Sequence, residues 1–159
     1  MAAELKVTSE DKGRLLIGRA PNGDTVVEIR RDNGAAALQT KNAAWRMEKA
    51  EGGSVVLDAA GATVARVRRR MVSGREIELA GGEQIRMSTM RLGIGHGCRF
   101  GDLADAKAPF LMPQRYFTLK LSDELLARPD RELLIAVFTS IADTAISTAI
   151  QTSAQGTTG

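Results

Sequence analysis

The sequence predicts a mainly β protein, a closed or nearly closed antiparallel barrel built around one hydrophobic C-terminal helix. Between Leu5 and Leu121, short alternating segments are separated by turn residues about every 8–12 positions, which is typical of an all-β chain. After Ser122 the periodicity becomes helical. Because 159 residues suit one domain, we expect a single domain over residues 1–152, a central helix at about 130–150 and a disordered polar tail at 153–159.

The first predicted strands alternate clearly and are bounded by turn chemistry. Val27 and Ile29 share one side of a strand at 25–30, while Glu28 and Arg30 face the other. The Asn33-Gly34 pair that follows suits the positive φ angles of a hairpin turn. Further strands are predicted where the same alternation recurs between Gly-containing turns, at 44–49, 54–57 and 63–67.

The later strands complete a meander of about ten or more strands. Strands are expected at 77–79, 83–92 and 116–121, whereas 93–114, which contains several Gly and two Pro residues, is expected to be a long loop. No strand–helix–strand crossover is visible, so a parallel nucleotide-binding sheet is excluded.

The C-terminal helix decides the architecture. Asp130 is its expected N-cap, with Glu132 favourably placed in the first turn. Residues 133–138 are all apolar, and a helix that is apolar on every side must be surrounded by lipid or by the protein's own core. A membrane span needs about 20 mostly apolar residues, but the window 133–150 includes Asp143 and five other polar residues. We therefore expect no transmembrane segment, and a helix enclosed by the strands.

Three segments carry a resemblance to a known group: the hairpin at 56–70, the strand at 116–121 and the helix from Asp130 onward. In this combination, over about residues 13–150, the chain resembles the tubby C-terminal-like superfamily, which includes phospholipid scramblases and LURP-one-related proteins. The resemblance implies a barrel of about twelve strands around the helix. It also implies recognition of anionic lipid headgroups by basic side chains. An acidic calcium loop and a cysteine cluster of the scramblase kind are both missing from the sequence.

The densest basic cluster lies in the middle third of the chain, where basic residues outnumber acidic ones. Arg66, Arg68 and Arg70 share the outward face of a predicted strand, and Arg75 follows across a tight turn. Their guanidinium groups are suited to a phosphorylated headgroup, so these four residues are the predicted anion-binding site. The alternative is a solvated strand face that discourages edge pairing. Arg69 points inward on the same strand, and we expect it to pair with Asp143.

The sequence offers little catalytic or metal-binding chemistry. A single His96 and a single Cys98 exclude multi-histidine metal sites and intrachain disulfides, so we expect no metal and no cofactor. The Gly-rich run at 93–98 lacks the helix and the third spaced glycine of a dinucleotide-binding motif. A small hydrolase that uses His96 with Cys98, oriented by Asp102 or Asp105, remains an alternative.

These observations predict a non-enzymatic binding module for anionic lipid headgroups or other phosphorylated ligands. A scramblase-like lipid-handling protein is the alternative that the resemblance suggests. Aromatic residues make up only 4% of the chain, too few for the stacking platforms of nucleic-acid binding. No apolar run follows Met1, so we expect a cytoplasmic protein, peripheral at the membrane if its ligand is a lipid.

Overall fold

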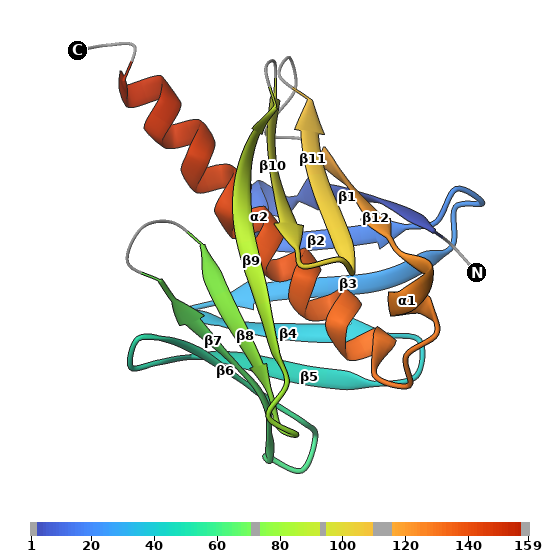
Figure 1. Cartoon of the computed structure of the whole chain (residues 1–159). Coiled ribbons are helices and arrows are strands. Elements are labelled where there is room, and N and C mark those ends of the chain that lie inside the picture. Colours follow the sequence, from blue (N-terminus) through green and yellow to red (C-terminus); the bar gives the residue numbers. More distant parts are fainter. Residues whose placement is uncertain (1–2, 71–73, 93–94, 110–115, 157–159) are drawn as a thin grey trace.

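The computed structural model is a closed barrel of antiparallel strands with one long helix running through it (Figure 1). It describes residues 3–70, 74–92, 95–109 and 116–156. The strands are β1 Glu4–Glu10, β2 Leu15–Arg19, β3 Thr25–Asp32, β4 Ala35–Thr40, β5 Ala44–Ala50, β6 Gly53–Leu57, β7 Thr63–Arg69, β8 Arg75–Leu79, β9 Gln84–Leu92, β10 Gly95–Phe100, β11 Ala104–Pro109 and β12 Tyr116–Leu121. A 3-10 turn, η1 (Asp11–Gly13), and two helices, α1 (Asp123–Leu126) and α2 (Arg131–Gly156), complete the fold.

The strands form an up-and-down meander in which each strand pairs with its sequence neighbours. The barrel closes where β1 pairs with β12, for example at Val7 opposite Phe117. Register shifts in the β2–β3 and β6–β7 pairs mark local irregularities of the ladder. The predicted twelve-stranded antiparallel barrel with a central hydrophobic helix is therefore confirmed.

The interior of the barrel is filled by α2. Alternate residues of each strand face inward, and the helix residues Leu134, Val137 and Phe138 are completely buried. Phe138 stacks on Phe100 of β10, with ring centroids 4.3 Å apart. By length and composition alone, Arg131–Ala149 is apolar enough to cross a bilayer, and 61% of that window is buried inside the structure. The continuous apolar run is thus satisfied by the protein's own strands.

The helix does not occupy the barrel symmetrically. It packs mainly against β10, β3, β4 and β11. The inward residues of β11 are Ala104, Ala106 and Ala108, all buried, and their small side chains allow a close approach of the helix. Because α2 lies towards this side, space remains on the opposite side of the barrel, near β5 to β8.

Two sequence-based expectations about element boundaries are wrong. Within 93–114, where a long loop is expected, residues 95–109 contain β10 and β11, and residues 93–94 and 110–114 lie outside the described residues. The inward face of β11 is built from alanines, so it lacks the large β-branched residues that usually mark a strand. In addition, α2 extends to Gly156, beyond the expected end near residue 150, and the expected disordered tail is helical at 153–156.

A group of ion pairs fixes the start of α2. Arg128 donates to both carboxylate oxygens of Glu83, at 2.8 and 2.6 Å, and to those of Asp130, at 2.9 and 3.1 Å. These hydrogen bonds lower the pKa of Glu83 and of Asp130. Asp130 immediately precedes the helix and Glu83 immediately precedes β9, so Arg128 ties the entry of α2 to the barrel wall.

Replacement of Phe138 by Ala tests the role of the helix as core. Loss of a fully buried aromatic ring should lower the free energy of unfolding by about 3–5 kcal/mol, measured by urea denaturation. Ser147→Ala, at an exposed position of the same helix, is the control and should change it by less than about 0.5 kcal/mol. Equal, small effects of both substitutions would contradict the enclosed helix.

Candidate functional site: a basic cavity at one rim of the barrel

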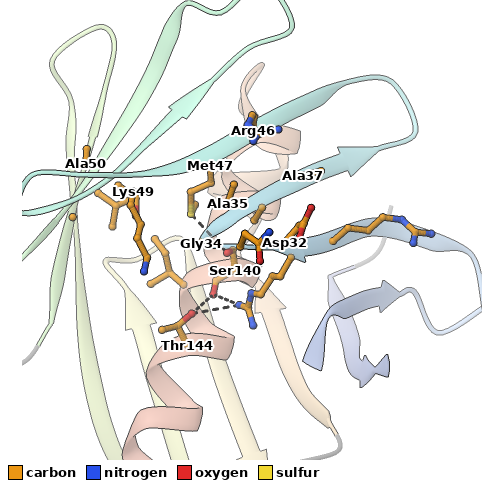
Figure 2. A pocket seen from close by; sticks show the side chains of 18 of the residues that line it. Asp32, Gly34, Ala35, Ala37, Arg46, Met47, Lys49, Ala50, Ser140 and Thr144 are labelled. Atoms are coloured by element: carbon orange, nitrogen blue, oxygen red, sulfur yellow. Dashed lines mark hydrogen bonds between the residues drawn. The ribbon is translucent and has the colours of Figure 1, made fainter. Parts of the chain in front are cut away.

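A cavity of about 1130 Å³ opens at the rim of the barrel, beside the middle of α2 (Figure 2). It lies between the helix residues Ser140, Ile141 and Thr144 and the strand ends of β3 to β8. Among the described residues, its lining includes seven basic side chains and two acidic ones. These are Arg14, Arg30, Arg31, Arg46, Lys49, Arg69 and Arg75, with Asp11 and Asp32. We call this space the basic cavity.

Two arginines face each other across neighbouring strands at the wall of the basic cavity. Arg69, the last residue of β7, is directly opposite Arg75, the first residue of β8. They lie on the inward side of the sheet because they alternate in step with the buried residues Val67 and Ile77. No carboxylate of the described part of the chain forms an ion pair with either. Two like charges are therefore held side by side without compensation.

This arrangement disfavours the charged form of Arg75. The residue is half-buried, and this burial lowers the pKa of its guanidinium below the ordinary value. The positive charge of Arg69 lowers the pKa of Arg75 further. An anion placed between the two guanidinium groups would offset the lowered pKa of Arg75, since it would supply negative charge and hydrogen-bond acceptors.

Two glycines position these arginines. A Cβ on Gly53 would lie 1.8 Å from the carbonyl oxygen of Val67, so only glycine lets β6 approach β7 this closely just before Arg69. Gly74 precedes Arg75, has a φ of +122°, and would bring a Cβ to 2.6 Å from the Met87 carbonyl oxygen. Substitution of either glycine would move a strand that carries one of the two cations.

Lys49 supplies a further cation on the same rim. It follows the inward positions Trp45 and Met47 on β5, and its side chain lies across Gly34 of the neighbouring turn (Figure 2). Its ammonium forms no ion pair with a described carboxylate. The sequence analysis did not single out Lys49, although the alternation that starts at Trp45 places it on the inward face.

Arg31 also reaches the basic cavity, but its charge is compensated. Its Nη1 lies 2.5 Å from Oδ2 of Asp143, in an ion pair whose side chains are only 29% and 16% exposed. Its Nη2 donates to the carbonyl oxygen of Ser140 and to the hydroxyl of Thr144. The expected pairing of Asp143 with Arg69 is therefore wrong. The partner is Arg31 of β3, because α2 packs more closely against β3 than against β7.

The four predicted anion-binding residues lie on two different faces of the wall. Arg66, Arg68 and Arg70 are exposed on the outer face, as the alternation predicted. Arg68 pairs with Glu78 at 3.4 Å and Arg70 with Glu76 at 3.7 Å, both across to β8. Arg75 lies on the inner face, where Arg69 accompanies it. The structure thus separates Arg75 from the other three arginines. It places Arg75 beside Arg69, for which the sequence predicts only a structural role.

The residues of the hydrolase alternative are placed on β10, in the turn after it and on β11. Cys98 is completely buried, and burial raises the pKa of its thiol to about 12. Asp105 pairs with Arg99 at 2.9 Å, and alternation puts both on the outer face, away from Cys98. Asp102 is exposed in the turn at the opposite end of β10 from His96. Neither carboxylate is placed to orient the imidazole.

Comparison with known proteins finds no match. No protein-family model, no curated protein and no solved structure matches the chain. The resemblance to the tubby-like group stays a prediction from the sequence, and the functional argument depends on the geometry of the basic cavity.

The Arg31–Asp143 pair should contribute measurably to stability. In a double-mutant cycle with Arg31→Met and Asp143→Asn, we expect a coupling energy of about 1–3 kcal/mol by urea denaturation, since the pair is largely shielded from water. The matched cycle at the exposed Arg68–Glu78 pair should give about 0–1 kcal/mol. Equal coupling energies in the two cycles would contradict the special position of Arg31.

The thiol of Cys98 should be inert in the folded protein. At about pH 8, where an ordinary thiol of pKa about 8.5 is partly ionised, iodoacetamide should leave native Cys98 unmodified, as measured by mass spectrometry. The same reagent should modify the residue fully in guanidinium chloride. Rapid modification of the native protein would contradict the burial and would revive the hydrolase alternative.

Proposed function

We propose that this chain is a non-enzymatic binding module for anionic, phosphorylated ligands, and that its binding site is the basic cavity. The observation that carries the proposal is the cross-strand pair Arg69 and Arg75, which faces the cavity without a carboxylate partner among the described residues. Arginine forks are suited to bidentate hydrogen bonding with phosphate oxygens. Lys49 adds a third uncompensated cation from the neighbouring wall.

The cavity supports this function better than the outer wall does. On the outer wall, Glu76 and Glu78 already accompany Arg70 and Arg68. A phosphate bound there would have to compete with these carboxylates, and exposed charges are screened by salt. In the cavity, half-burial of Arg75 reduces the dielectric screening of its charge, so that each interaction with an anion is stronger.

The ligand would be a phosphorylated metabolite or the headgroup of an anionic lipid. The resemblance to the tubby-like group favours the lipid, and the protein would then act at a membrane surface from the cytoplasm. Of the other functions considered, hydrolysis lacks an observation in its favour, since Cys98 is buried and protonated. Scrambling would need a helix that contacts lipid, whereas the first half of α2 is enclosed.

Titration calorimetry with inorganic pyrophosphate at low salt tests the site. The double variant Arg69→Gln/Arg75→Gln should bind pyrophosphate at least about tenfold more weakly than the wild type, because two charge-assisted contacts are lost. The matched control Arg66→Gln/Arg68→Gln removes the same charge from the outer wall of the same strand, and its affinity should stay within about twofold of wild type.

Thermal unfolding of both double variants establishes that each is folded. Loss of binding in the Arg66/Arg68 variant alone would move the site to the outer wall, where the sequence predicts it. Lack of pyrophosphate binding by the wild type would contradict the proposed function. Flotation with phosphatidylcholine vesicles, with and without phosphatidic acid, then distinguishes a lipid headgroup from a soluble phosphate.

A further inference from the structure

The basic cavity has two chemically different sides. On the β7–β8 side, Arg69 and Arg75 carry uncompensated charge. On the β3–α2 side, the charge of Arg31 is neutralised by Asp143, and its Nη2 donates to Ser140 and Thr144 of the helix. A ligand that fills the cavity therefore meets uncompensated arginines at the β7–β8 side and a neutralised arginine beside α2, which we call the neutral side.

Part of this side is an apolar strip. It is lined by Met47 of β5, Ile141 of α2 and the small residue Ala36 of β4, and Val67 joins it to the cationic side. Met47 is half-buried and packs against the core, while Ile141 and Ala36 are buried. Carbon-rich surfaces of this kind favour methylene groups over water or charge.

One hydroxyl on the neutral side has only a weak partner. Ser140 is 4% exposed, and the hydrogen bond of its Oγ is to the thioether sulfur of Met47, at 3.8 Å (Figure 2). A thioether is a poor acceptor, so this hydroxyl is free to turn towards an ester or hydroxyl oxygen of a ligand. It would mark the junction between a polar head and an apolar chain.

The size of the cavity also argues against a small inorganic anion as its natural occupant. A volume of about 1130 Å³ is slightly above that of pockets that hold whole small molecules, for which about 300–1,000 Å³ is usual. A phosphate group held by Arg69 and Arg75 would occupy a small part of this space, and the remainder borders α2.

We propose that the basic cavity binds an anionic amphiphile: a phosphate-type head contacts Arg69 and Arg75, and an alkyl chain lies between Met47 and Ile141. This inference rests on the proposed function and specifies its ligand class. It assigns the cavity to one lipid-like molecule whose chain enters the barrel, in contrast to a headgroup held at the surface alone.

The affinities of alkyl phosphates, each used at concentrations where it is monomeric, distinguish the contribution of the phosphate head from that of the alkyl chain. n-Octyl phosphate should bind the wild type at least about tenfold more tightly than methyl phosphate, because each buried methylene can raise affinity up to about fourfold. n-Octyl glucoside, which has the same chain without a charge, should bind at least about tenfold more weakly than n-octyl phosphate.

Two single substitutions, one in the cavity and one outside it, test where the alkyl chain lies. Met47→Gln places a polar amide on the neutral side and should remove most of the preference for octyl over methyl phosphate, while methyl phosphate affinity stays within about twofold. Val55→Gln makes a comparable change on β6, at a half-buried position outside the cavity lining, and should keep the preference. Thermal unfolding shows that both variants are folded.

The outcomes are separable from those of the proposed function. Equal affinity of the wild type for octyl and methyl phosphate would overturn the amphiphile and leave the anion site standing. Failure of every phosphate to bind would overturn both. An unchanged chain preference in Met47→Gln would also overturn the inference, because the chain would then lie elsewhere. Vesicle flotation with phosphatidic acid shows whether the amphiphile is taken from a bilayer or from solution.

Discussion

The structure depends on one constraint, the need to enclose a helix segment that is apolar on every side. The five consecutive residues 134–138 point in all directions around α2, and all five are buried. A single sheet could cover only one side of such a helix, so the sheet has to curl around it and close. The closed barrel and its long meander follow from this requirement, since closure also removes the exposed edges of the sheet.

The basic cavity exists because α2 lies off-centre in the barrel. The small inward residues Ala104, Ala106 and Ala108 let α2 lie towards β11, and Arg31 holds the helix to β3 through Asp143. On the side of the barrel away from β11, the inward residues at the strand ends border the basic cavity. Arginines can occupy inward positions there because the cavity is open to water, whereas the inward positions deeper in the barrel carry Val67 and Ile77.

Local patterns in the sequence accounted for much of this structure, and long-range geometry for the rest. Alternation predicted most strands and the inward direction of Arg69, and the run at 133–138 predicted the enclosed helix. The alternation on β11 was hidden because alanines replace the usual large residues. Alternation shows which face of the sheet a residue occupies, but it does not show where the helix lies inside the barrel. The partner of Asp143 and the depth of the cavity therefore could not be predicted from the sequence.

The closing seam between β1 and β12 has a consequence for how the chain folds. Every other strand pair joins neighbours in sequence, so eleven of the twelve ladders can form as local hairpins. The last ladder joins the two extremities of the barrel-forming segment, and its loop entropy is unfavourable until the intervening sheet is in place. Before that step the nascent sheet has two open edges and an uncovered apolar face. Because α2 follows β12 along the chain, it becomes available to cover that face only after all twelve strands.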